Sequence, residues 1–235
     1  MPATRHTLIR SRIFILSLVS EQDRRLHALS QIRQTGLAFE LVDALDSRML
    51  RREVMEVPAS AWSLSDGEVA CYLSHLRLLQ RLCDYDLDYA IILEDDFVLG
   101  ESEKLSLATL WDHLPVGADH VQLHDTKGKN FDQYRMIEAG PLFNRVSPSN
   151  VGSWAYVVSR KLAEAIVQQH PVPRMPIDHL YIDLSRRSGE FAFYDLNERL
   201  VGYMPDEPSS IDRSQPSQRA RKTFREWWNE RWIRR

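Results

Sequence analysis

The chain has 235 residues, 43% of them hydrophobic and 27% charged, and a formal net charge of -3. This is the composition of a globular protein, and the length suits one large α/β domain. No apolar run approaches the roughly 18 residues of a membrane-spanning helix, and residues 1–11 lack the apolar core and cleavage site of a signal peptide. Cys71 and Cys83 lie twelve positions apart on one predicted helix, too far for a disulfide. A cytoplasmic protein with reduced cysteines is therefore expected.

The N-terminal part of the chain predicts a strand, a helix and a second strand. Residues 12–19 are rich in β-branched and aromatic residues, and residues 39–44 repeat that character. Between them, apolar residues at helical spacing predict a helix that ends at Gly36, a suitable C-cap; the apolar positions are Leu26, Leu29 and Ile32. Together these elements form a βαβ unit.

A connecting loop and a long helix follow. Residues 46–62 are charged and contain Pro58, which predicts a loop with a short helical piece. Ser65 and Glu68 have the spacing of a capping box, which predicts the start of a strong helix. An apolar stripe at helical spacing supports that helix, formed by Val69, Tyr72, Leu73, Leu76, Leu79, Leu82 and Cys83.

The next segment combines a buried strand with an acidic end. Residues 90–93 are wholly apolar, which predicts a strand buried on both faces of an α/β sheet, and Glu94, Asp95 and Asp96 follow directly. Neighbouring carboxylates repel one another, and a divalent cation with oxygen ligands would compensate their charge. A solvated acidic turn is the alternative. Because alternate side chains of a strand share a face, Glu94 and Asp96 are expected on one side and Asp95 on the other.

The rest of the chain continues to alternate between predicted helices and strands. Expected in order are a helix over residues 103–113, a strand over 120–124, a loop region over 125–150 that contains a hairpin, a strand over 152–158, a helix over 162–169 and a helix over 179–188. This alternation predicts an α/β sheet with helices on both faces.

Five segments carry a family resemblance by their order and spacing. They are the first strand with Asp23, Arg24 and Arg25 after it, residues 64–75, residues 90–96, residues 152–160, and the pair Ile177 and Asp178. Together they resemble glycosyltransferase family 25, the bacterial lipopolysaccharide and lipooligosaccharide galactosyltransferases, over residues 12–212. The resemblance implies a GT-A-like (Rossmann-like) mixed sheet flanked by helices in a domain of residues 1–212. It also implies a UDP-sugar donor, commonly UDP-galactose, a divalent metal (Mn²⁺, or Mg²⁺ as the alternative) and a saccharide acceptor.

The resemblance also implies roles for residues of the donor site. Glu94 and Asp96 match the Asp-any-Asp motif of GT-A enzymes and are expected to bind the metal and the diphosphate, Asp96 more directly. Asp95 is then left for the ribose or the donor sugar. Further donor contacts are expected from Leu16, Ser17, Leu18 and Arg24. The family usually has Ile-Asn-Leu where this chain has Leu16, Ser17 and Leu18. For Arg24, a surface ion pair with Asp23 or Glu21 is the alternative.

Inverting transfer needs a base that accepts the proton of the acceptor hydroxyl. Asp178 is the predicted base, since it lies in the family-like element after a segment broken by prolines, and Asp125 is the second candidate. Asp178 could equally be the N-cap of the helix that follows, and one residue could do both.

Histidines and a cysteine near the acidic segment are weaker candidates. Cys71 and His75 lie one helical turn apart, which would suit a metal, but a packed thiol and a hydrogen-bonded core imidazole are the favoured interpretation. His75 is expected to support the acidic residues from behind. His124 and His179 are candidates for a third metal ligand.

The C-terminal segment, residues 213–235, is predicted to be a basic, tryptophan-rich helix. Arginines and lysine dominate residues 219–235, and the aromatic residues Phe224, Trp227, Trp228 and Trp232 recur there at helical spacing. This pattern is typical of a helix that binds peripherally to the inner face of an anionic membrane. Docking of the helix on the acidic surface of the protein itself is the alternative. No recognition motif for nucleic acid accompanies the basic residues, so no nucleic-acid partner is expected.

The predicted function is metal-dependent, inverting transfer of a hexose from a UDP-sugar to a lipopolysaccharide or lipooligosaccharide acceptor, and galactose is the hexose expected. The alternative is a catalytically inactive carbohydrate- or nucleotide-binding partner protein of the same pathway. Ser17 favours that alternative, whereas the intact acidic residues and Asp178 favour the enzyme.

Overall fold

The computed structural model describes residues 9–50, 64–100, 106–124, 136–138, 142–146, 152–187, 189–196 and 200–204. In chain order the elements are β1 (Ser11–Ser17), α1 (Gln22–Gln34), β2 (Phe39–Asp43), the 3-10 helix η1 (Ser47–Met49), α2 (Asp66–Asp84), β3 (Tyr89–Glu94), β4 (Phe97–Leu99), α3 (Leu110–His113), β5 (His120–Gln122), β6 (Met136–Glu138), β7 (Phe143–Val146), β8 (Ala155–Ser159), α4 (Arg160–Gln169), α5 (Ile177–Arg186), β9 (Phe193–Leu196) and β10 (Val201–Tyr203). Among these residues the strands form an eight-stranded sheet in the order β2-β1-β3-β8-β5-β9-β7-β6 and a two-stranded sheet of β10 and β4.

The predicted βαβ unit is confirmed. β1 and β2 are parallel, with Ile13 opposite Phe39, and α1 connects them. Gly36 follows the end of α1 with a φ of 68°, the left-handed conformation that favours glycine. The predicted inner face of α1 is partly wrong, because Leu26 is 63% exposed. The buried face is Arg24, Ala28 and Ile32, which are spaced four residues apart and therefore lie on one side of the helix.

β3 lies in the middle of the large sheet. It is parallel to β1 and antiparallel to β8, so the sheet is mixed. Its apolar residues Ala90, Ile91, Ile92 and Leu93 are fully buried, as predicted. The strand ends at Glu94, and after a turn β4 leaves the sheet to pair with β10.

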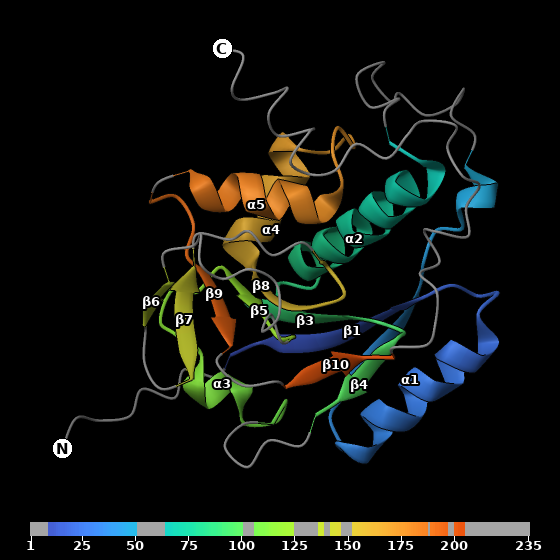
Figure 1. Ribbon diagram of the computed structural model, residues 1–235, viewed down its shortest axis with the longest axis horizontal. Coiled ribbons are helices and arrows are strands. Elements are labelled where there is room, and N and C mark those ends of the chain that lie inside the picture. Colours follow the sequence, from blue (N-terminus) through green and yellow to red (C-terminus); the bar gives the residue numbers. More distant parts are fainter. Residues whose placement is uncertain are drawn as a thin grey trace.

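Helices cover both faces of the large sheet, which confirms the predicted α/β class of a mixed sheet flanked by helices. In Figure 1, α2, α4 and α5 lie on one side of β1 and β3, and α1 and α3 lie on the other side. Each side has its own hydrophobic core. The core towards α2 includes Phe14, Ile92 and Leu79. The core towards α1 includes Ile15, Ile91 and Ile32. Alternate residues of β1 and β3 therefore supply the two cores.

The start of α2 confirms the predicted capping box. The Glu68 N–H donates to Ser65 Oγ at 3.2 Å, and the Ser65 N–H donates to Glu68 Oε2 at 2.7 Å. This reciprocal arrangement satisfies two donors at the helix start. It fixes the start of α2, whose second and third turns carry Cys71 and His75.

Several other predictions are tested by the described residues. β6 and β7 form the expected hairpin, and both cysteines are free thiols. The predicted helix over residues 103–113 is shorter, since α3 begins at Leu110 after a turn. In the described part of the chain, no helix has the length and apolar character needed to cross a membrane. Asp125 and the basic segment of residues 213–235 lie outside the described residues.

Candidate active site

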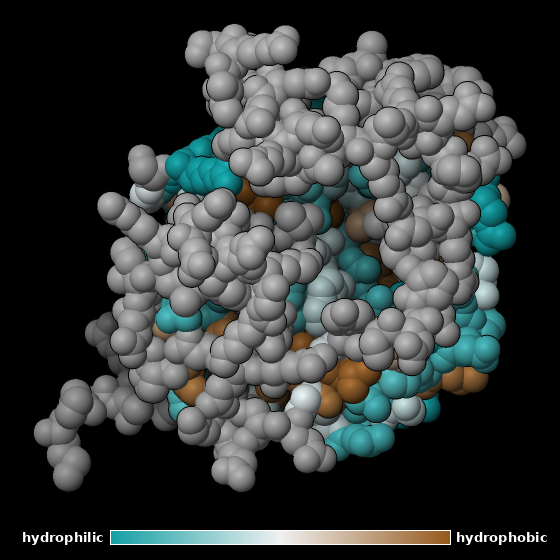
Figure 2. All heavy atoms as spheres, viewed as in Figure 1, coloured by the Kyte–Doolittle hydropathy of each residue, from teal (hydrophilic) through white to brown (hydrophobic). Residues whose placement is uncertain are grey.

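A pocket lies at the carboxyl ends of the parallel strands β1, β2 and β3, next to the N-terminal half of α2. This edge of an α/β sheet is where ligands usually bind. The residues that line the pocket are Leu16, Ser17, Leu18, Arg24, Ala44, Leu45, Ser47, Gly67, Ala70, Cys71, Ser74, Glu94 and Asp95. The lining includes the residues predicted to contact the donor and also Glu94, but not Asp96, the other residue predicted to bind the metal and the diphosphate. Figure 2 shows hydrophilic side chains at the floor of a hollow near the middle of the viewed face.

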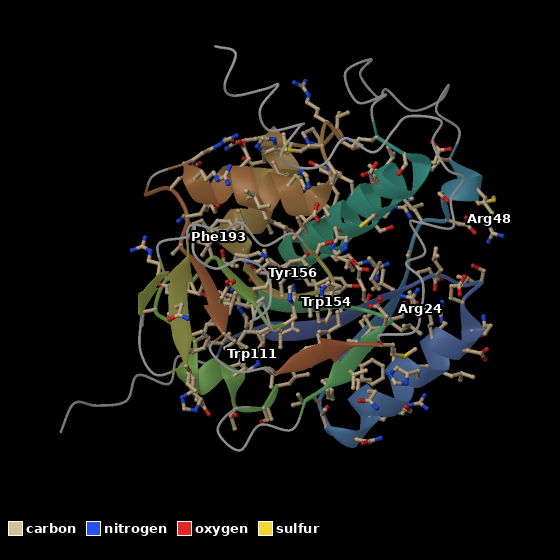
Figure 3. All side chains as sticks on the ribbon, in the orientation of Figure 1. Arg24, Arg48, Trp111, Trp154, Tyr156 and Phe193 are labelled. Carbon is tan, nitrogen blue, oxygen red and sulfur yellow. The ribbon has the colours of Figure 1, made fainter. Side chains whose placement is uncertain are left out.

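Arg24 connects α1 to the acidic end of β3. Its Nη2 lies 2.5 Å from Asp95 Oδ1 and 3.3 Å from Asp96 Oδ2, and the side chains of Arg24 and Asp95 are each only 7% exposed. The Ser17 hydroxyl donates to Asp95 Oδ2 at 2.7 Å. In Figure 3, Arg24 lies where α1 begins, beside the end of β3. The expected alternative of a surface position for Arg24 is therefore wrong, because its side chain is buried against the two aspartates.

Glu94 belongs to a different set of contacts. His75 Nε2 lies 3.2 Å from Glu94 Oε1, and the Ser153 hydroxyl donates to the same oxygen at 3.4 Å. The side chains of Glu94 and Asp96 were predicted to share one face. In the structure their ion-pair partners differ, because Asp96 and Asp95 both pair with Arg24 whereas Glu94 contacts His75. The physical reason is that β3 ends at Glu94, so the alternation of a strand does not extend to Asp96.

The charge of this site is unbalanced. Three carboxylates and Arg24 converge at the end of β3, and His75 contacts Glu94. Burial, and next the charge of Glu94, raise the pKa of Asp96 to about 6. Burial also raises the pKa of Asp95, although Arg24 and Ser17 oppose that shift. Arg24 alone does not compensate the three acids.

These residues fit a divalent cation. Asp96 Oδ1 is buried and has no hydrogen-bond partner among the described residues. An orphaned, buried carboxylate oxygen in an acidic site is an unfavourable arrangement that a hard cation with oxygen ligands would relieve. Asp96 and Glu94 are the residues that would hold it.

Asp178 lies in the first turn of α5 and faces the same region. Its pKa is raised, first by burial and also by the charge of Glu94. The alternative role as N-cap is wrong, since the N-cap is Pro176 and makes no side-chain cap. Asp178 Oδ1 instead accepts the N–H of His179 at 2.8 Å. Asp178 is thus a fourth carboxylate near the acidic end of β3, and among the described residues it has no ion pair with an arginine or lysine.

Comparison with known proteins identifies the chain. A family model described as "Glycosyltransferase family 25 (LPS biosynthesis protein)" matches residues 10–181. The chain belongs to glycosyltransferase family 25.

Three relatives illustrate the range of this family. The Haemophilus influenzae "Lipooligosaccharide biosynthesis protein lic2B" is 29% identical over 162 residues, which are 65% of this chain and 61% of that protein. The human "Procollagen galactosyltransferase 2" is 24% identical over 71% of this chain and 29% of that protein. The bovine "Probable inactive glycosyltransferase 25 family member 3" is 27% identical over 71% of this chain and 30% of that protein. The chain thus spans less than two thirds of the length of these relatives.

In this family member, His75 has both roles that the sequence predicted. It is a fully buried, hydrogen-bonded imidazole, and it supports Glu94 from behind. His75 Nδ1 lies 2.8 Å from the Tyr156 hydroxyl, to which the Tyr181 hydroxyl donates at 2.9 Å. Sequence analysis missed both tyrosines, which lie far from α2 in the chain. An apolar strand and helix that each carry one tyrosine offered no signal for this contact.

The remaining histidine candidates stay predictions. His124 stacks on Trp154, with 4.3 Å between ring centroids, and contacts Gln122. In Figure 3, Trp154 and Tyr156 lie near each other close to the middle of the molecule. His124 thus contacts the last residue of β5 and the residue that precedes β8. His179 follows Asp178 in the first turn of α5.

Proposed function

We propose that this protein transfers galactose from UDP-galactose to a saccharide acceptor of the lipopolysaccharide type, in an inverting reaction that depends on a divalent cation. Membership of glycosyltransferase family 25 supports a glycosyl transfer. The lipooligosaccharide and procollagen galactosyltransferase relatives support the acceptor class and the sugar. The observation that carries the proposal is the pocket at the ends of β1, β2 and β3, whose acidic side is held by Arg24 and His75.

The donor would lie across this pocket with its diphosphate at the acidic end of β3. When bound, a divalent cation would neutralise the charge that develops on the departing diphosphate. Glu94 and Asp96 would hold that cation, and the neighbours of the two carboxylates limit their motion. Arg24 anchors Asp96 through its second oxygen, and His75 anchors Glu94. Preorganised side chains of this kind reduce the cost of ordering the site on binding.

Asp178 would act as the base for the acceptor hydroxyl. In an inverting displacement, the hydroxyl oxygen attacks the anomeric carbon as its proton passes to the carboxylate. Burial and the charge of Glu94 raise the pKa of Asp178, which makes it a stronger base than an exposed aspartate. Its position in the first turn of α5 keeps it off β3, so one side chain would serve the acceptor while others serve the donor.

The test is a donor screen with separate readouts for binding and turnover. UDP-galactose, UDP-glucose and the N-acetylhexosamine donors are compared with Mn²⁺, with Mg²⁺ and with a chelator. Binding is measured calorimetrically and transfer or hydrolysis by released UDP. We expect Asp96→Asn to abolish cation-dependent donor binding, and Asp178→Asn to keep donor binding while transfer is lost. Asp84→Asn, which changes an exposed acid at the end of α2, is the matched control.

Two results would contradict the proposal. If no donor binds with any cation, the assignment of the pocket fails. If donors bind but none is hydrolysed or transferred, the protein is an inactive binding partner. This second candidate function is supported by the bovine relative, which is named as an inactive member of the family. Ser17, whose hydroxyl donates to Asp95, occupies a position at which the family usually has asparagine. In that case Ser17→Asn is the first variant to test for restored transfer.

A further inference from the structure

A second group of metal-ligating side chains lies directly beside the donor site. Cys71, His75 and Glu94 each offer one ligand atom, and these three atoms all lie within 4.8 Å of one another. Cys71 and His75 are one turn apart on α2, so their side chains project from the same face of the helix. The end of β3 brings Glu94 to that face from another part of the chain. Sequence spacing alone favoured a packed thiol and a core imidazole, and the third ligand changes that interpretation.

The distances suit a small tetrahedral ion. Bonds of about 2.0–2.3 Å to sulfur, nitrogen and oxygen place pairs of ligand atoms about 3.4–3.6 Å apart in a tetrahedral zinc site. His75 Nε2 is 3.2 Å from Glu94 Oε1, close to that separation. The sulfur of Cys71 lies within 4.8 Å of the other two ligand atoms, so it would have to approach them by roughly 1 Å at most to reach the same range.

The surroundings of the three ligands resemble those of built metal sites. The second nitrogen of His75 lies 2.8 Å from the Tyr156 hydroxyl, which fixes the ring and leaves Nε2 facing Glu94. Outer hydrogen bonds of this kind orient metal-bound histidines. Ser153 donates to Glu94, which limits the motion of that carboxylate. Cys71 and Glu94 both line the pocket, so an ion has an entry path and an open fourth position for water.

We propose that Cys71, His75 and Glu94 form a binding site for a borderline-soft divalent cation, Zn²⁺ in the first place. A mixed sulfur, nitrogen and oxygen donor set favours Zn²⁺ or Co²⁺, whereas Mn²⁺ and Mg²⁺ prefer oxygen ligands. The site therefore differs in chemistry from the pair Glu94 and Asp96. Glu94 belongs to both groups and serves one ion at a time. Zinc binding thus withdraws Glu94 from the donor site, a consequence that rests on the proposed function.

The binding test uses the full chain after removal of metals with a chelator. Co²⁺ is titrated while the thiolate-to-cobalt charge-transfer absorption in the near ultraviolet is recorded. We expect this band to saturate at one equivalent in the wild type and in Cys83→Ser, which removes the other cysteine from the same helix. The band should be absent in Cys71→Ser, and Zn²⁺ should displace Co²⁺ in the proteins that show it. Circular dichroism establishes that each variant is folded.

A second measurement checks the nitrogen and oxygen ligands. Competition with a chromophoric chelator gives the zinc affinity, which should fall at least tenfold in Glu94→Gln and in His75→Gln, since even the loss of an outer-shell partner of a metal ligand costs about 10–100-fold. A wild type without the charge-transfer band would overturn the proposal. So would a band that persists in Cys71→Ser, or a zinc affinity that is unchanged in all three ligand variants.

The consequence for the donor has its own readout. Calorimetric binding of UDP-galactose with Mn²⁺ is measured before and after addition of one equivalent of Zn²⁺. We expect Zn²⁺ to weaken donor binding in the wild type and to have no effect on the donor affinity that Cys71→Ser itself shows. A cobalt band in a protein that binds no donor would leave the metal site standing and refute the proposed function. A cobalt band together with donor binding that ignores Zn²⁺ would refute the shared use of Glu94.

Discussion

Replacing Asp96 by asparagine should stabilise the metal-free protein at neutral pH, although it removes a proposed cation ligand. Asp96 is a partly buried acid beside two other acids, and its buried Oδ1 has no hydrogen-bond partner among the described residues. Its pKa is raised to about 6 from 3.8. A group whose folded pKa is raised is costly to ionise in the folded state. The loss of folding stability caused by this ionisation is fully present well above pH 6, the pKa in the folded state. It decreases as the pH falls below 6 and disappears below the pKa in the unfolded state.

The magnitude follows from the shift. About two pKa units at 1.36 kcal/mol each correspond to roughly 3 kcal/mol of lost stability at pH 7.5, and the same linkage leaves about 1 kcal/mol at pH 4.5. Asparagine keeps the shape without the charge. We therefore expect Asp96→Asn to raise the free energy of unfolding by about 1–3 kcal/mol at pH 7.5 and by clearly less at pH 4.5.

The assay is urea unfolding in the presence of a chelator at both pH values, followed by circular dichroism. Asp84→Asn is the control for the loss of one negative charge at an exposed site. The reasoning is refuted if Asp96→Asn is less stable than the wild type by the same amount at both pH values. In that case the attraction of Arg24 for Asp96 balances burial and repulsion by Glu94, because a stability difference that does not change with pH means an unshifted pKa. A cation should also raise the melting temperature of the wild type and not that of the variant.

Three further predictions follow from single features of the structure. Ser65→Ala removes the N-cap of α2 and should cost about 1 kcal/mol of stability by urea unfolding, with donor affinity unchanged. Gly36→Ala should also cost about 1 kcal/mol, since φ is 68° but the added methyl would have no neighbour within 4 Å; an unchanged stability would contradict the left-handed conformation. Cation-dependent donor affinity should rise about tenfold between pH 5 and pH 7, because Asp96, with a pKa of about 6, must lose its proton to bind the cation; a flat calorimetric profile would exclude Asp96 as a ligand.

Local patterns predicted much of this fold. The capping box of Ser65 and Glu68, the glycine after α1 and the apolar run of β3 each depend on neighbours within a few residues, and each is found as expected. The face of α1 was predicted wrongly because hydrophobicity was counted and charge was not. Leu26 is exposed, and Arg24 is buried by its attraction to the two aspartates.

The candidate site divides in the same way. The acidic residues, Arg24 and the pocket-lining residues at the end of β1 could be found in the sequence, because the family motifs and the end of a buried strand mark them. The partner of each acid could not be predicted. Whether an acid faces Arg24 or His75 depends on where β3 ends and on how α1 and α2 pack against it. Spacing along the sequence gives no information on these distances between separate elements.

The family, the α/β alternation and the position of the acidic segment can thus be predicted from the sequence alone. The ion pairs and contacts of the acids are visible only in the folded protein. There, Asp95 and Asp96 pair with Arg24, whereas Glu94 contacts His75 and lies near Cys71. The physical reason is range. Helix caps and strand burial are set by residues close in the chain, whereas ion pairs and metal ligands need atoms from separate elements within a few ångströms.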